Sequence, residues 1–160
     1  MDIVKQAQGG QTVAVTEEQL EQISRFSRRP MKAEEVYCFS VRLCDDQVDR
    51  DGERFPRKTL EELAELFVGK SGLFDHSWSA RGQAARIYAA EVVQEEKLTR
   101  TGEPYCWLKG YAYMVRTADN EGLMREIEGG IKKEVSVGCA VERRADSLRL
   151  RAEGPLRAIP

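Results

Sequence analysis

Residues 129–141 read Gly-Gly-Ile-Lys-Lys-Glu-Val-Ser-Val-Gly-Cys-Ala-Val, and this stretch decides the predicted fold. From Val135 to Val141, larger apolar residues alternate with small ones, which is the period-two pattern of a β-strand. The small residues Ser136 and Gly138 leave space for another backbone to lie close to the strand. We therefore expect Ser136 on the floor of a groove. The alternative is a small residue in a packed sheet, because a serine hydroxyl is a weak nucleophile without an adjacent base.

The single histidine of the chain, His76, lies far ahead of Ser136 and directly after a predicted helix. Hydrolytic enzymes commonly bring a serine and its base together from distant segments, because position in space matters and order in sequence does not. The competing interpretation of His76 is a structural histidine in a loop. Asp75 is a poor candidate to orient the imidazole ring, because neighbouring residues on extended backbone point to opposite sides.

Together, the two segments resemble the sequence pattern of tailed-phage prohead (capsid maturation) serine proteases. That pattern is Asp-His-Ser or Asn-His-Asp after a helix, followed in mid-chain by Gly-x-x-(Lys)-Glu-(Leu/Val)-Ser-(Ile/Val)-Gly-(Phe/Cys). Residues 75–77 and 130–138 match it, and a looser similarity extends from about Val36 to Arg144. The family shares its fold with the herpesvirus assembly proteases.

The resemblance implies a catalytic pair in which Ser136 is the nucleophile and His76 is the general base. It implies an α+β fold, a mostly antiparallel, herpesvirus-protease-like β-barrel wrapped by helices and incomplete at its C-terminus. The implied function is that of a phage prohead serine endopeptidase, a hydrolase that cleaves scaffold and capsid polypeptides, and itself, during viral capsid maturation and virion morphogenesis. We expect it to self-associate and to act within the procapsid, in the host bacterial cytoplasm.

Beyond Arg144 the sequence departs from the family. Family members continue to a strand whose acidic residue is thought to orient the histidine, and none of the acids after Ser136, namely Glu142, Asp146 and Glu153, has that context. We expect either a truncated or replaced C-terminal part, or a partner that supplies the missing group. Loss of an orienting carboxylate costs a serine protease roughly 10⁴ in turnover. The alternative function is therefore a catalytically inactive capsid-assembly binding module of the same fold.

Length and composition predict one globular domain. The chain has 160 residues, of which 41% are hydrophobic and 32% charged, so it has room for one core and not for a second full domain. We expect an N-terminal arm and helix over residues 1–30, a prohead-protease-like barrel domain over 31–144 and a divergent tail over 145–160.

Charge and hydropathy weigh against several other classes of protein. The net charge is −2 with acids and bases interspersed, so we expect no nucleic-acid partner; a nucleic-acid-binding module, based on pairs such as Lys132-Lys133, is the third and weakest alternative. No apolar run approaches the roughly 18 residues that span a bilayer, and the first residues lack a signal-peptide pattern, so we expect a cytoplasmic protein with no membrane partner.

The four cysteines contain no CxxC pair, so we expect reduced thiols and neither a metal nor a cofactor. The alternate aspartates of residues 45–53 resemble the start of a calcium loop, but the flanking helices and the glutamate at loop position 12 are missing. Turn chemistry explains Asp51-Gly52 adequately, so we expect no metal there.

Periodicity and capping signals predict the remaining elements. We expect a mobile or extended arm over residues 1–15 and a helix that begins with a capping box at Thr16. Further along, we expect a central strand over 36–44 and a helix capped by Thr59 and ended by Gly69. The remaining expected elements are a hairpin of strands 83–93 and 105–114, a helix from about 119 to 128 and the strand 135–141.

Overall fold

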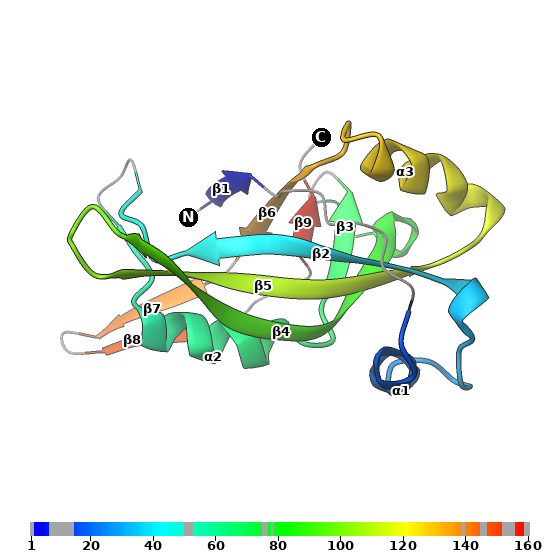
Figure 1. Cartoon of the computed structure of the whole chain (residues 1–160), viewed down its shortest axis with the longest axis horizontal. Coiled ribbons are helices and arrows are strands. Elements are labelled where there is room, and N and C mark those ends of the chain that lie inside the picture. The colour runs from blue at the N-terminus through cyan, green and yellow to red at the C-terminus, as the bar shows by residue number, and fades with distance from the viewer. Residues whose placement is uncertain are drawn as a thin grey trace.

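A strongly curved sheet and three α-helices make up the protein, as a computed structural model describes it (Figure 1). The structure describes residues 2–6, 15–49, 53–74, 77, 79–138, 140–144, 147–151 and 156–158. The strands are β1 (Asp2–Gln6), β2 (Val36–Asp45), β3 (Ser71–Phe74), β4 (Gln83–Leu98), β5 (Pro104–Val115), β6 (Glu134–Gly138), β7 (Ala140–Arg144), β8 (Ser147–Arg151) and β9 (Leu156–Ala158). The helices are α1 (Glu17–Ser24), α2 (Arg57–Phe67) and α3 (Ala118–Glu128), with short 3-10 helices η1 (Ala33–Glu35) and η2 (Ala80–Gly82).

Within the described residues, seven strands form one sheet in the order β1-β6-β9-β3-β4-β5-β2, while β7 and β8 form a separate pair. The neighbours β3, β4, β5 and β2 are antiparallel, whereas β9 runs parallel to β3. The sheet is not closed, because no pairing among the described strands joins its two edges, β1 and β2. The α+β class is thus confirmed, and the expected barrel is not. The strand predicted over residues 36–44 forms as β2, but the prediction that it is central was wrong, because β2 pairs only with β5 at an edge of the described sheet.

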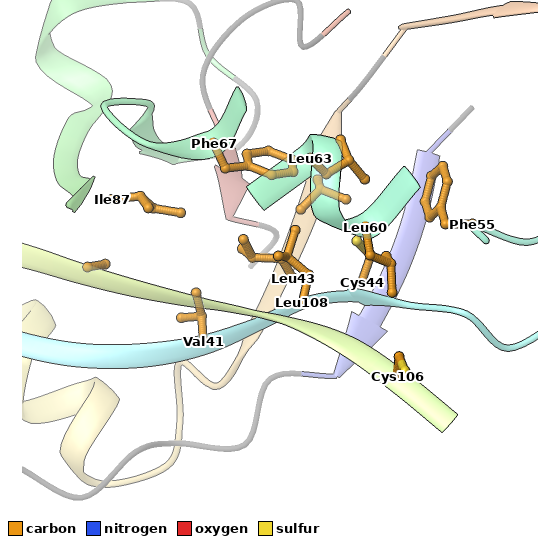
Figure 2. Close-up of a cluster of buried hydrophobic side chains, with 12 residues drawn as sticks. Val41, Leu43, Cys44, Phe55, Leu60, Leu63, Phe67, Ile87, Cys106 and Leu108 are labelled. Carbon is orange, nitrogen blue, oxygen red and sulfur yellow. The ribbon is translucent and has the colours of Figure 1, made fainter. Parts of the chain in front are cut away.

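Helix α2 packs on the face of the sheet formed by β2, β4 and β5 (Figure 2). Leu60, Leu63 and Phe67 recur at helical spacing and are at most 1% exposed, so this apolar stripe explains why the segment is a helix. The predicted N-cap was wrong: the helix begins three residues earlier, after the N-cap Pro56, and Thr59 lies buried within its first turn. The buried residues of this core are Val41, Leu43, Cys44, Phe55, Leu60, Leu63, Phe67, Ile87, Cys106, Leu108, Ala112 and Val137.

Helix α1 covers the opposite face of the sheet. The predicted capping box is confirmed, since Thr16 Oγ1 accepts the Gln19 N–H at 3.2 Å and Gln19 Oε1 accepts the Thr16 N–H at 3.0 Å. Ile23 is fully buried against Tyr88 and its neighbours, so the helix packs on its own domain. Helix α3 buries Met124 in a third cluster with Tyr37 and Met114, and Gly130, at φ +72°, lets the chain turn towards β6.

The strand predicted over residues 135–141 is two strands. β6 ends at Gly138, and the chain continues as β7, which pairs with β8 outside the large sheet. The predicted tail contributes β8 and also β9, which lies between β6 and β3. None of the helices in the described ranges has the length and apolar character that crossing a membrane requires.

Candidate active site

Ser136 lies in the middle of β6, between two strands from opposite ends of the chain. Its Cα is paired with that of Val4 in β1 on one side and with that of Arg157 in β9 on the other. Figure 1 shows β1, β6, β9 and β3 gathered in this part of the molecule. The predicted candidate nucleophile therefore lies within a sheet and has a strand on each flank.

The two valines beside Ser136 define which way its side chain points. Val137 is 1% exposed in the core under α2, and Val135 packs against the same core. Because successive side chains of a strand alternate between faces, Ser136 points to the other face of the sheet. Its exposure is 0%. A peptide carbonyl reaches this hydroxyl only if the chain that covers it moves aside.

His76, the predicted general base, lies outside the described residues, as does Asp75. The described residues on either side are Phe74, which ends β3, and Ser77, whose N–H donates to the Phe74 carbonyl at 2.8 Å. Two residues further on, Ser79 begins η2 and its Oγ accepts the Gly82 N–H at 3.1 Å. Hydrogen bonds thus hold the described residues Phe74, Ser77 and Ser79.

The sheet register connects β3 with the Ser136 strand. Arg157 in β9 is the Cα partner of both Leu73 in β3 and Ser136 in β6. Leu73 and Ser136 therefore lie in one row across the sheet, separated by two strand spacings, or about 10 Å of backbone. The strand β3 ends at Phe74, immediately before the histidine motif. This strand and β6, which carries Ser136, thus belong to one sheet with β9 between them.

The group that would orient the histidine is not assigned. Glu142 lies in β7, where its Cα is paired with that of Arg149 in β8, outside the large sheet. Asp146 and Glu153, the other acids considered from the sequence, lie outside the described residues. Of the residues that are described, no three His, Cys, Asp or Glu side chains are grouped so that they could hold a metal ion.

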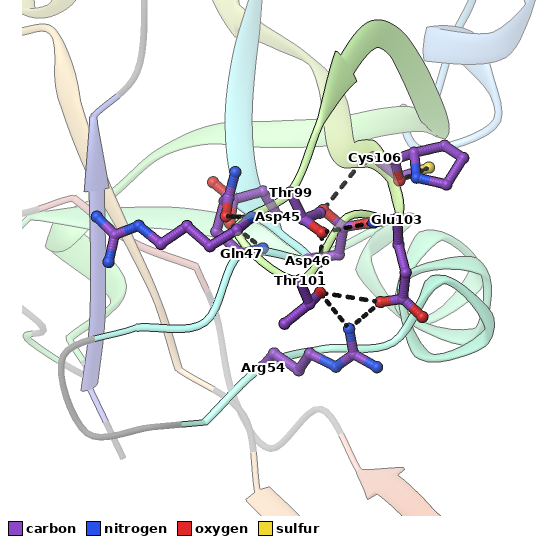
Figure 3. Close-up of polar contacts among 10 residues, drawn as sticks. Asp45, Asp46, Gln47, Arg54, Thr99, Thr101, Glu103 and Cys106 are labelled. Carbon is purple, nitrogen blue, oxygen red and sulfur yellow. Dashed lines mark hydrogen bonds and ion pairs between the residues drawn. The ribbon is translucent and has the colours of Figure 1, made fainter.

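A polar cluster that sequence reasoning did not find joins the loop after β2 to the β4–β5 turn (Figure 3). Asp46, only 6% exposed, accepts the Cys106 N–H on Oδ1 at 3.1 Å, and its own N–H donates to the Cys106 carbonyl at 3.0 Å. Asp45 Oδ2 accepts the Tyr105 hydroxyl at 3.0 Å. Arg54 forms an ion pair with Glu103 across the same junction.

The contacts of this cluster hold the loop after β2 against β5, and we call the cluster the Asp46 latch. Burial is the main cause that raises the pKa of the Asp46 carboxyl, while the Cys106 N–H opposes that shift. Burial and the nearby Asp45 carboxylate also raise the pKa of the Tyr105 hydroxyl. Asp45 Oδ1 also accepts the Gln47 N–H at 3.0 Å, so the acids at the end of β2 serve both a local turn and donors of β5. Asp51 and Gly52, where turn chemistry was predicted, lie outside the described residues. The only sequence signal was the adjacency of two acids at the end of a buried strand.

Two of the described cysteines have the properties of unactivated thiols. Cys38, Cys44 and Cys106 are all buried, and burial affects the pKa of Cys38 and Cys106. Burial raises the pKa of the Cys38 thiol to about 11 and also raises that of Cys106, so both remain thiols at neutral pH. Reactive cysteines have the opposite shift and are partly exposed, so a cysteine nucleophile is disfavoured at these positions.

Aromatic side chains on the face of the sheet opposite α2 are covered by the protein's own cations. The Arg42 guanidinium lies 4.2 Å from the Trp107 ring centroid, and Lys97 Nζ lies 4.0 Å from that of Tyr105. Both cations also pair with Glu95, each at 2.9 Å. Because these ring faces already carry partners, they are poor platforms for stacking nucleic-acid bases.

No family model, curated protein or solved structure matches the chain.

Proposed function

We propose that the chain is a serine endopeptidase of the phage prohead type, with Ser136 as nucleophile and His76 as general base. The observation that carries the proposal is the shared row of Leu73, Arg157 and Ser136, since it relates the strand leading into the histidine motif to the strand that carries the serine motif. We propose that the fold is of the herpesvirus-protease type, and that the curved, open sheet is an incomplete form of the barrel found there. Substrates are scaffold and capsid polypeptides and the chain itself, inside the procapsid in the host cytoplasm.

The chemistry follows from the two side chains. The Ser136 oxygen attacks a peptide carbonyl while His76 takes the hydroxyl proton, and a tetrahedral oxyanion forms that backbone N–H groups stabilise. The C–N bond then breaks as the imidazolium gives its proton to the leaving amine. Water, deprotonated by His76, hydrolyses the acyl-enzyme and restores the serine. Without an orienting carboxylate, turnover is expected to be slower by up to roughly 10⁴.

A second candidate function is a binding module of the same fold without catalysis, used in capsid assembly. Two observations favour it: Ser136 is 0% exposed, and no described carboxylate is assigned to the site. In this case the chain recognises capsid or scaffold polypeptides and does not cleave them.

The decisive test is labelling of the purified full-length chain with a fluorophosphonate probe, which forms a covalent bond only with an activated serine. The protease proposal predicts time-dependent labelling that is lost in Ser136→Ala and strongly reduced in His76→Gln. The matched control is Ser40→Ala, which removes a half-buried serine from β2 and is expected to label like the unmodified chain. Absence of labelling in the folded, unmodified chain would leave the binding module as the better explanation.

Autoproteolysis gives a second measurement on the same proteins. Intact-mass spectrometry of the unmodified chain is expected to reveal slowly accumulating fragments, because a protease present at high concentration is its own substrate. Ser136→Ala should remain intact under the same conditions, while Ser40→Ala should be cut normally. Equal cleavage of all three proteins would identify a contaminating protease and count against the proposal.

A further inference from the structure

We infer that the edge of β6 is a binding surface for an extended polypeptide and that the chain's own β1 occupies it. Residues 2–6 thus hold the position beside Ser136 that a guest strand takes after β1 leaves. The sheet order gives β1 this position beside β6. That the guest is a substrate rests on the proposed function.

The sheet order makes β1 an edge strand with a single partner in the sheet. It pairs antiparallel with β6 from Asp2 opposite Gly138 to Gln6 opposite Glu134, and no described strand pairs with its outer side. Main-chain hydrogen bonds supply the affinity in such an arrangement, and they do not depend on the identity of the strand. Any extended chain with compatible side chains is able to make the same ladder.

Because β1 is short, it is easier to release than the long strands of the same sheet. It has five residues, whereas β5 has 12 and pairs on both sides, with β4 and with β2. Local opening has the lowest free energy where few contacts and few shared hydrogen bonds hold a segment. We therefore expect β1 to leave the sheet far more often than β5 does.

The register defines the chemistry of the guest. Ile3 stands opposite Val137 and Val4 opposite Ser136, while the polar residues Asp2 and Lys5 flank this pair. A guest that takes this position runs antiparallel to β6 and has two apolar residues at its centre. The residue in the place of Val4 lies across from Ser136, so the β6 edge presents the guest backbone to the candidate nucleophile.

The test uses the full-length chain with Val4→Pro and Lys5→Pro together. Inter-strand hydrogen bonds of an antiparallel pair alternate along a strand, so two adjacent prolines remove at least one ladder N–H whichever residue carries it. The matched control is Val4→Thr with Lys5→Thr, which keeps both N–H groups and the β-propensity. The probe is a fluorescein-labelled synthetic peptide of residues 1–8, measured by fluorescence anisotropy.

The peptide is expected to bind the proline variant at least about tenfold more tightly than the unmodified chain or the threonine control, because in those the tethered β1 competes at high effective concentration. A scrambled peptide of the same composition should bind the proline variant at least about tenfold more weakly. Equal binding to all three proteins, or none to a folded proline variant, overturns the inference.

A measurement on the unmodified chain covers the case in which the proline variant does not fold. Native-state hydrogen exchange should report the amides of residues 134–138 that bond to β1 as opening at least about tenfold more readily than amides in the centre of β5. Protection of β6 equal to that of β5 overturns the inference regardless of any variant.

Fluorophosphonate labelling separates this inference from the proposed function. If both hold, Ser136 is labelled faster in the proline variant than in the unmodified chain. Peptide binding without labelling of Ser136 retains the exchangeable strand and rejects the protease. Labelling of Ser136 with no peptide binding retains the protease and rejects the exchangeable strand.

Discussion

The two ends of the large sheet are held together in different ways. At one end, β2, β4 and β5 have 10, 16 and 12 residues and share a buried core with α2. At the other, β1, β6 and β9 have five, five and three residues, and Asp2 is paired with Gly138 across almost the whole chain. Pairing segments that are so far apart in the sequence costs more loop-closure entropy than pairing the consecutive strands β4 and β5, and the shorter strands form fewer hydrogen bonds. Stability is thus concentrated at the β2–β4–β5 end, whereas the candidate site lies at the β1–β6–β9 end.

The largest expected effect comes from breaking the core at the long-strand end. Leu63 is fully buried under α2, so Leu63→Ala removes apolar contacts and leaves a cavity that should cost about 2–5 kcal/mol of unfolding free energy. Leu98→Ala is the matched control, because Leu98 is 64% exposed, and it should change little. Urea denaturation measures both, and equal losses would contradict the assignment of stability to this core.

Close packing between β2 and β5 gives a second, smaller test. A Cβ at Gly110 would lie 3.0 Å from Leu43 Cδ1 and 3.1 Å from Ile87 Cδ1, so Gly110→Ala should cost about 1–3 kcal/mol through overpacking. Gly122→Ala in α3 is the control, since nothing lies within 4 Å of its added Cβ and alanine favours a helix by up to about 1 kcal/mol. Thermal unfolding should therefore move in opposite directions for the two variants.

The latch around Asp46 is expected to contribute to the same end of the sheet. Asp46→Ala leaves the buried Cys106 N–H without its acceptor and should cost about 1–3 kcal/mol. Asp46→Asn keeps an acceptor oxygen, so it should cost less.

The contribution of Asp46 to the free energy of unfolding should depend on pH in a definite direction. Because the folded pKa of Asp46 is raised, its stabilising contribution is complete below the unfolded pKa of about 3.9 and is lost as pH rises through the folded value. The amide introduced by Asp46→Asn does not titrate, so the deficit of this variant relative to the unmodified chain should shrink as pH rises towards neutrality. Urea titrations at several pH values measure this trend, and a growing deficit would contradict it.

The smallest expected effect is on the connection between α1 and β2. A hydrogen bond from the Arg29 guanidinium is the main cause that lowers the pKa of Glu35 to about 2. The stability from this carboxylate is present above the unfolded pKa of about 4.3 and lost as pH falls through about 2. Glu35→Gln should therefore make the free energy of unfolding depend less on pH between about 4.3 and about 2, the acid limb of the stability curve. Glu34→Gln, a neighbouring exposed glutamate, is the charge-matched control and should leave the limb as it is.

The sequence predicted the long-strand end well, because local signals are strong there. The alternation through β4 and β5, the Leu60–Leu63–Phe67 stripe and the capping box at Thr16 all specify structure within a few residues. The scarcity of polar residues in β2 predicted a strand correctly but its central position wrongly, since neighbours in a sheet depend on tertiary context. The latch was missed because an aspartate that accepts a distant backbone N–H looks the same in sequence as one in a turn.

The other end was predicted less completely, for a physical reason. Ser136 was placed correctly on a strand, but the neighbours of that strand are short segments from residues 2–6 and 156–158 whose pairing depends on tertiary context. No periodicity within three or five residues identifies a strand reliably. The position of His76 relative to Ser136 stays a prediction, since His76 lies outside the described residues.

The pairing of β1 with β6 sets an order of events on the ribosome. Residues 2–6 are made first, yet the strand that receives them is completed only after residue 138, which at about 5–20 residues per second is a delay of roughly 7–26 s. The β4–β5 hairpin and α2 are complete before then. A nascent chain therefore carries residues 2–6 without their β6 partner until residue 138 has been made, and Ser136 acquires its β9 neighbour only after residue 158.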